Sequence, residues 1–264
     1  MTFNKNSLSS AQLKSICKSL RIGRYITENM DNLIEELCAS QASPRETIST
    51  FLSEICQARD LNKQQMLLSM ACLPNDASLD NFDFSVSTVN EAILRELAEC
   101  RWIDEHRNII FHGDPGLGKT HLACALGRQA IIRGYSTLFI SANKLLAALD
   151  KARNEHCLQD KLSKLCRNKL LIIDEVGYPT TGDLNDAAAL LYTLIDARYE
   201  RLSTVITTNR SFDEWPKYLG GDVKCTKAII DRFLHHSIQI PMTGESYRLR
   251  DFKKKSMESK EKHQ

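Results

Sequence analysis

Residues 113–120, GDPGLGKT, constrain this chain more strongly than any other stretch of its sequence. They satisfy the pattern G-x-x-x-x-G-K-[ST], in which glycines let the backbone curl so that its N–H groups surround an anion. The apolar residues 109–111 precede the loop, and residues 121–126 follow it with a helical composition. Because the motif needs a strand before it and a helix after it, the chain is predicted to build an α/β fold around a phosphate-binding loop.

The loop also supplies side chains for phosphate and metal binding. Lys119 is placed to contact the β- and γ-phosphates of ATP, and Thr120 to hold Mg²⁺ through its hydroxyl. The alternative is a glycine-rich turn in a sheet that binds no nucleotide. The residues predicted to bind ATP are Gly113, Asp114, Pro115, Gly116, Leu117, Gly118, Lys119, Thr120 and His121.

Two carboxylates follow the apolar run LLII at residues 170–173. A buried strand that ends in acids delivers them to the edge of an α/β sheet where ligands bind. Asp174 suits Mg²⁺ binding through a water molecule of the ion, and Glu175 suits the general base that polarises the water attacking the γ-phosphate. A glutamate beside the aspartate is typical of water-activating ATPases and argues against a small-molecule kinase. The alternative interpretation is a pair of acids that merely begins a surface loop.

A further strand candidate, residues 204–208, also ends in a polar side chain. Asn209 comes directly after it, where it could lie between the two carboxylates and the γ-phosphate. We expect it to orient the attacking water. The alternative is an asparagine tolerated in a turn.

Five short apolar runs alternate with helical stretches in the second part of the chain. They cover residues 108–112, 136–141, 170–173, 204–208 and 237–240. Strands separated by helices form βαβ units, so we predict a five-stranded, mostly parallel sheet.

The first 80 residues are predicted to form a small all-helical domain. Leu13, Ile16, Cys17 and Leu20 follow a helical period, and Ser43-x-x-Glu46 is a capping box that begins a third helix. Residues 71–90 are rich in helix breakers, and Thr88-x-x-Glu91 is predicted to restart a helix. The predicted domains are therefore residues 1–80, residues 81–250 and a charged tail, 251–264.

Composition excludes some classes of protein. The formal net charge is only +2, so any nucleic-acid surface must come from local clustering rather than bulk charge. The sequence has neither an apolar run long enough for a membrane helix nor a signal-peptide core, which predicts a cytoplasmic protein. Its nine cysteines form no C-x-x-C pair. We favour ordinary packing over metal binding for His156, Cys157 and Cys166.

Several segments carry longer characteristic sequences than the general motifs require. FDFS at 82–85, GDPGLGKTHLACALG at 113–127, LLIIDEVGY at 170–178, ARYERLSTVITTN at 197–209, FDEW at 212–215, IIDRFLHH at 229–236 and GESYRLR at 244–250 stand in a characteristic order. Together they resemble the IstB-like transposition helper ATPases, which belong to the initiator and helicase-loader branch of the AAA+ ATPases. The DnaC-like helicase loaders are close relatives. The resemblance covers residues 80–250 densely, and residues 1–80 only in general plan.

This resemblance implies an ATPase whose subunits assemble on duplex DNA and act on a partner transposase. Nucleotide in such assemblies lies between subunits. Asn209 matches the sensor-1 position, Arg232 the arginine finger that reaches the neighbour's site, and Arg248 the sensor-2 residue that contacts the γ-phosphate in its own site. Arg210 departs from the relatives, which often carry an uncharged residue there. Arg250 has no assigned role and is interpreted as a solvated charge.

Candidate DNA contacts follow the second predicted strand. Residues 143–153 are predicted to form a helix that carries Lys144, Lys151 and Arg153, and the resemblance implies a DNA-contacting helix here. The alternative is that these charges solvate a helix face, and the N-terminal helical domain is a second candidate for DNA or partner docking. Two other functions stay open: a DnaC-like helicase loader, and a DNA scaffold gated by nucleotide with little turnover.

Overall fold

The computed structural model describes residues 8–20, 22–39, 43–74, 76–178, 186–247 and 250. The chain divides into two compact units, Met1–Met66 and Leu67–Gln264. Each unit has its own buried core, and each is described by itself below.

The N-terminal unit is helical, as predicted. Its buried core is small: Cys17, Ile26, Met30 and Ala58 form the centre. The predicted capping box at residue 43 is present, because the Ser43 N–H donates to Glu46 at 2.8 Å and the Glu46 N–H donates back to the Ser43 hydroxyl at 3.4 Å. The helices are α1 (Ser10–Ser19), α2 (Arg24–Glu28), α3 (Met30–Ala39) and α4 (Pro44–Met70).

The helix α4 continues past the end of the N-terminal unit. Leu67 and Ala71 are buried with Ile131 of α7 (Lys119–Ile132) in a small apolar cluster of the second unit. This packing explains why the compact units divide at Met66 and Leu67. The predicted domain boundary at residue 80 stays a prediction.

The second unit contains a five-stranded sheet in which every pairing is parallel, in the order β2-β3-β4-β1-β5. This confirms the predicted sheet. Strand β1 lies between β4 and β5, and its residue Ile109 pairs with Val205 of β4 and with Ile238 of β5. The strands are β1 (Asn108–Gly113), β2 (Thr137–Ser141), β3 (Leu170–Asp174), β4 (Ser203–Thr208) and β5 (Ser237–Met242).

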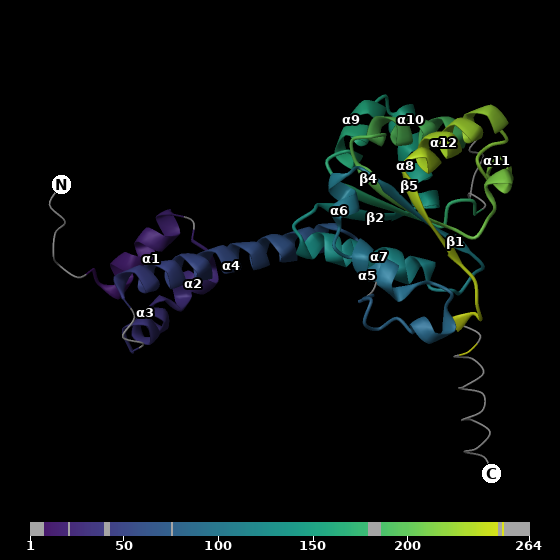
Figure 1. The fold of residues 1–264 in the computed structure, drawn as a ribbon. Coiled ribbons are helices and arrows are strands. Elements are labelled where there is room, and N and C mark those ends of the chain that lie inside the picture. The colour runs from purple at the N-terminus through teal and green to yellow at the C-terminus, as the bar shows by residue number, and fades with distance from the viewer. Residues whose placement is uncertain are drawn as a thin grey trace, which may run out of the picture. The chain divides into compact units, whose positions relative to one another are not determined.

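Helices cover both faces of this sheet (Figure 1). Alternate strand residues point to opposite faces, so Ile109 and Phe111 enter one core cluster and Ile110 enters the other. The first cluster packs against α5 (Glu91–Leu97), α6 (Arg101–Asp104) and α7. The second packs against α8 (Ala142–Asn154), α9 (Leu158–Leu165), α10 (Ala187–Arg198) and α12 (Val223–His235). Short elements complete the unit: η1 (Phe84–Val86), η2 (Phe212–Glu214) and α11 (Trp215–Tyr218).

The capping box predicted at Thr88 is wrong. The N-cap of α5 is Asn90, whose side-chain oxygen accepts from the Ala92 N–H at 2.9 Å. Thr88 is occupied elsewhere: its hydroxyl donates to the Thr243 carbonyl at 3.2 Å and accepts from the Thr243 N–H at 3.0 Å. A tertiary contact across the chain has replaced the local one.

Candidate nucleotide-binding site

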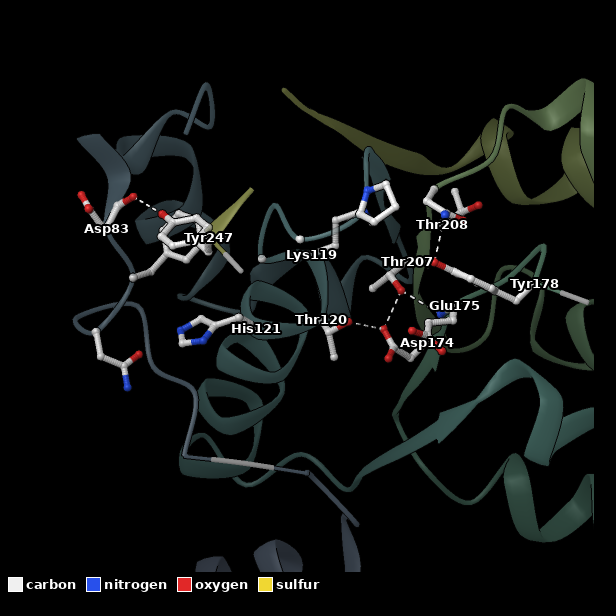
Figure 2. A pocket seen from close by; sticks show the side chains of 16 residues that line it. Asp83, Lys119, Thr120, His121, Asp174, Glu175, Tyr178, Thr207, Thr208 and Tyr247 are labelled. Carbon is white, nitrogen blue, oxygen red and sulfur yellow. Dashed lines mark hydrogen bonds between the residues drawn. The ribbon is translucent and has the colours of Figure 1, made fainter. Parts of the chain in front are cut away.

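A pocket of about 420 Å³ opens at the carboxyl ends of β1, β3 and β4 (Figure 2). Its position agrees with the rule that parallel sheets bind ligands at this edge. The described loop residues Gly113, Asp114 and Leu117 lie outside its lining, and Leu117 is buried in the core. The predicted residues that line it are Pro115, Gly116, Gly118, Lys119, Thr120, His121, Asp174, Glu175 and Asn209.

Two glycines of the loop allow close approaches that no other residue would permit. Gly113 has a φ of 148°, and a Cβ there would overlap the carbonyl oxygen of Met242. Gly118 has a φ of 88°, and a Cβ there would lie 2.6 Å from the Phe82 ring. The loop is thus held between the end of β5 and the segment that precedes η1.

The loop leads directly into α7, which begins at Lys119. The Lys119 ammonium curls back over the loop and donates to the carbonyls of Gly113 at 2.7 Å and Asp114 at 2.6 Å. The N-terminus of a 14-residue helix and an ammonium group therefore meet at one point of the pocket. This combination suits an anionic ligand such as a phosphate.

Asp174 is the centre of the polar network at the end of β3. One of its carboxylate oxygens, Oδ1, accepts from the Thr120 hydroxyl at 2.8 Å and from the Thr207 hydroxyl at 2.6 Å. Asp174 is only 7% exposed, so these hydrogen bonds offset the cost of burying its charge. The two residues predicted to bind Mg²⁺, Thr120 and Asp174, are thus in direct contact.

Glu175 has an unusual backbone conformation. Its φ is 61°, in the left-handed region that a residue with a side chain rarely adopts. The Thr207 hydroxyl accepts from the Glu175 N–H at 2.9 Å, and the Thr207 carbonyl accepts from the next N–H, that of Val176, at 2.9 Å. Thr207 therefore holds the turn in which the Glu175 side chain is exposed and lines the pocket.

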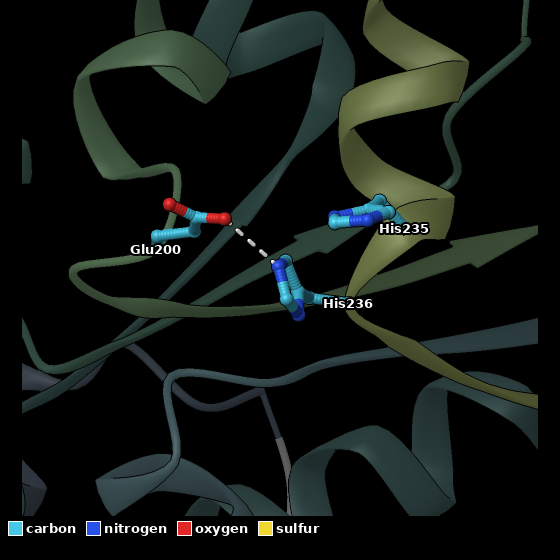
Figure 3. A group of neighbouring side chains, drawn as sticks. All are labelled: Glu200, His235 and His236. Carbon is cyan, nitrogen blue, oxygen red and sulfur yellow. Dashed lines mark hydrogen bonds and ion pairs between the residues drawn. The ribbon is translucent and has the colours of Figure 1, made fainter.

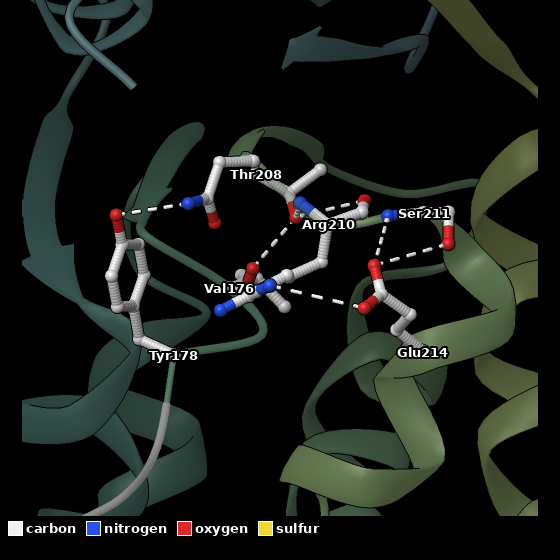
Figure 4. A network of polar contacts seen from close by, with 7 residues as sticks. Val176, Tyr178, Thr208, Arg210, Ser211 and Glu214 are labelled. Atoms are coloured by element: carbon white, nitrogen blue, oxygen red, sulfur yellow. Dashed lines mark hydrogen bonds and ion pairs between the residues drawn. The ribbon is translucent and has the colours of Figure 1, made fainter. Parts of the chain in front are cut away.

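Asn209 is oriented by a tyrosine that sequence reasoning had not selected (Figure 4). Its side-chain N–H donates to the Tyr178 hydroxyl at 2.9 Å, while its Oδ1 is shielded from solvent without a hydrogen-bond partner among the described residues. The next residue, Arg210, makes structural contacts. Its guanidinium carbon lies 5.0 Å from the centroid of the Tyr218 ring, and one of its nitrogens lies 3.8 Å from a Glu214 carboxylate oxygen.

Aromatic residues from distant parts of the chain form one wall of the pocket. Phe82 contacts the rings of Tyr247 and His121, with centroids 5.6 and 5.7 Å apart. The Tyr247 N–H donates to the Gly116 carbonyl at 3.0 Å, and its hydroxyl donates to the Asp83 carbonyl. Burial raises the pKa of Tyr247. The FDFS and SYR segments are part of the resemblance, but their meeting was not predictable from spacing.

The three C-terminal arginines differ in their places. Arg232 does not line this pocket. Its guanidinium lies 3.3 Å from a carboxylate oxygen of Asp196 and 4.5 Å from the centroid of the Tyr192 ring. It is beside Asn108, at the amino ends of the strands, opposite to the pocket. Arg248 lies outside the described residues. Arg250 is not the solvated charge that we expected, because its guanidinium lies 3.4 Å from an Asp83 carboxylate oxygen and its side chain is only 25% exposed.

The candidate DNA contacts all lie on α8. Lys144 is exposed, and Lys151 is 3.7 Å from a carboxylate oxygen of Glu155. Arg153 lies between two acids, 2.6 Å from Asp150 and 2.6 Å from Asp186. These carboxylates offset the positive charge that would attract a DNA phosphate, so Arg153 is the weakest of the three candidates.

The family described as IstB-like ATP binding protein matches residues 17–256, which extends the likeness into the N-terminal unit. The putative ATP-binding protein of insertion sequence IS5376 from Geobacillus stearothermophilus is 42% identical over 82% of this chain and 86% of its own length. The corresponding protein of IS21 from Pseudomonas aeruginosa is 35% identical over 87% and 86%.

Solved structures share the fold. The DnaC helicase loader has a TM-score of 0.52 at 22% identity and covers 64% of this chain and 97% of its own. The replication initiator DnaA, bound to AMPPCP and single-stranded DNA, has a TM-score of 0.54 at 21% identity; the match covers 71% of this chain but only 56% of DnaA. The predicted AAA+ P-loop fold is therefore confirmed. Within the described part of the chain, no helix has the length and apolar character needed to cross a membrane. From the extent of the family match and the identity to these relatives, the chain belongs to the IstB-like ATP-binding proteins of insertion sequences.

Proposed function

We propose that this protein hydrolyses ATP, assembles into oligomers on duplex DNA, and thereby assists a partner transposase of an insertion sequence in the cytoplasm. The observation that carries the hydrolytic part is the network around Asp174. It joins the phosphate loop, through Thr120, to the turn that presents Glu175. A site that only bound nucleotide would not need an acid held in this strained turn.

The residues present fit ATP and Mg²⁺. The Thr120 hydroxyl and the Asp174 carboxylate are hard oxygen donors 2.8 Å apart, which is the chemistry that Mg²⁺ prefers. When bound, the ion would offset charge on the β- and γ-phosphate oxygens. Lys119 and the loop amides would bind the same phosphates, and the aromatic wall with Phe82 and Tyr247 would close the other end of the pocket.

Two residues would act on the attacking water. Glu175 would accept its proton, because its side chain is exposed and lines the pocket, whereas that of Asp174 is buried. Asn209, held by Tyr178 at the lining of the pocket, would orient it through its side-chain amide.

The site would be completed by a second subunit. Arg232 lies at the amino ends of the strands, whereas the pocket of its own chain lies at their carboxyl ends. It could therefore contact a bound phosphate only in a neighbouring subunit. A guanidinium suits that role because it is always charged and binds phosphate oxygens in a forked geometry. Arg248 would contact the γ-phosphate in its own site.

DNA would bind without sequence preference, through phosphate contacts. Lys144 is the best-placed candidate on α8 because it is exposed, and Lys151 is the next. The relatives named above are proteins of insertion sequences, which supports a transposase as the partner. A helicase loader is the alternative, favoured by the likeness to DnaC. Copurification with a hexameric helicase in place of a transposase would decide for the loader.

The change Glu175→Gln tests the hydrolytic proposal. It keeps the shape of the side chain but removes the base, so ATP binding should persist while DNA-stimulated phosphate release falls by roughly 100-fold or more. Glu105→Gln is the matched control, since Glu105 is exposed and pairs with Arg107 outside the pocket. Unchanged phosphate release in Glu175→Gln would favour the alternative of a nucleotide-gated DNA scaffold.

A further inference from the structure

Three side chains that can bind metals converge where α10 and α12 end (Figure 3). Glu200, His235 and His236 each offer one ligand atom, and these atoms all lie within 4.8 Å of one another. His236 Nε2 is 2.9 Å from Glu200 Oε1. This cluster was not selected from the sequence, because Glu200 is 35 residues from His235.

The local backbone explains why two adjacent histidines can face one point. His235 is the last residue of α12, and His236 leaves the helix with a φ of −118°. Consecutive side chains of a continued helix would diverge by about 100°. Here the two rings instead meet edge to face, with centroids 4.2 Å apart. Glu200 approaches from the turn between α10 and β4, with a left-handed φ of 54°.

A neighbouring tyrosine orients one of the histidines. The Tyr199 hydroxyl is 3.1 Å from His235 Nδ1. In the tautomer whose Nδ1–H donates to that hydroxyl, Nε2 keeps its lone pair for a ligand. Metal-binding histidines commonly have such a partner on the second ring nitrogen.

We propose that Glu200, His235 and His236 form a binding site for a divalent transition-metal ion of the zinc class. Two imidazoles and a carboxylate suit Zn²⁺, Co²⁺ or Ni²⁺, whereas Mg²⁺ prefers an all-oxygen site such as that of Thr120 and Asp174. A tetrahedral ion with bonds of about 2.0–2.1 Å holds its ligand atoms about 3.3 Å apart. The cluster reaches this spacing by small side-chain rotations, since Glu200 and His235 are exposed.

Such an ion would act as a clamp between two helices. Tyr199 and Glu200 follow α10, while both histidines end α12. The same two helices carry the ion pair of Asp196 with Arg232, one turn before His236. Binding would therefore fix the turn of α12 from which Arg232 projects. The clamp itself does not depend on any role of Arg232 in hydrolysis.

Zinc binding to the reduced full-length chain tests this proposal without nucleotide. Chelator-treated protein is titrated with Zn²⁺ in competition with a chromogenic zinc chelator, and thermal unfolding is followed with and without Zn²⁺. Glu200→Gln and His235→Ala should each weaken binding by at least about tenfold and abolish the rise in Tm that Zn²⁺ gives the wild type. His156→Ala is the matched control, an exposed histidine beside a cysteine, and should bind as the wild type does.

Cobalt separates this site from the nine free cysteines. Co²⁺ bound at the proposed site should lack the thiolate-to-metal absorption that cysteine ligands produce. Equal zinc affinity in the wild type and in Glu200→Gln would overturn the proposal, as would a thiolate spectrum or a loss confined to His156→Ala. Because Glu200→Gln is isosteric and exposed, its circular dichroism in chelator should equal that of the wild type, which keeps the result interpretable if His235→Ala folds poorly.

Discussion

Thr207 shows how one hydroxyl can organise the candidate nucleotide-binding site. It donates to Asp174 and accepts from the Glu175 N–H, so it fixes both the predicted metal ligand and the predicted base. The residue is 1% exposed. Without this hydroxyl the Glu175 N–H loses its acceptor, and an unsatisfied buried group costs about 1–3 kcal/mol.

The substitution Thr207→Val should therefore lower both stability and turnover. Valine keeps the shape, but the Glu175 N–H loses its acceptor, so we expect the free energy of unfolding to fall by about 1–3 kcal/mol. ATP-dependent phosphate release should fall more than ATP affinity does, because the loop itself is untouched. Thr193→Val is the control: its exposed hydroxyl bonds only within α10, to the Ala189 carbonyl. Equal turnover in the two variants would contradict the role of Thr207.

Among the helices and strands, the sequence predicted those features that depend on residues close together in the chain. The five strands match their predicted runs to within two residues at each end, because buried apolar runs must pair in the sheet wherever the chain places them. The glycine loop and both carboxylates also converge as predicted. The aromatic wall did not follow from the sequence, since Tyr247 meets Asp83 across 164 residues and no periodicity records such a contact. The cap of α5 failed for the same reason, because Thr88 is held by Thr243.

The cap of α5 gives a test at this scale. Asn90→Ala removes the acceptor of the Ala92 N–H and should lower the free energy of unfolding by about 1 kcal/mol. Asn90→Ser keeps a capping oxygen, so its free energy of unfolding should fall by only about a few tenths of a kcal/mol. Chemical denaturation of both variants measures the difference. If alanine and serine are equally stable at this position, Asn90 is not the cap that stabilises the helix.

For the whole molecule, the cysteines report how the chain is packed. Cys100 and Cys124 are buried, and burial raises the pKa of the Cys100 thiol to about 11 and that of Cys124 to about 12. The thiolate is the reactive form, so both should resist an alkylating reagent at neutral pH in the native protein. Cys38, Cys56 and Cys72 are exposed and should react first. Mass spectrometry of briefly alkylated protein checks this order, which a wrong packing of α7 on the sheet would reverse.

The central claim concerns the whole assembly: ATP is hydrolysed at a site to which two subunits contribute. The most direct measurement mixes two inactive variants on duplex DNA and follows phosphate release. Arg232→Ala keeps its own pocket but lacks the arginine for its neighbour, whereas Lys119→Ala has a disabled pocket and an intact Arg232. We predict that the mixture regains activity that neither variant has alone. A mixture as inactive as its components, formed under conditions in which the wild type hydrolyses ATP, would contradict the account.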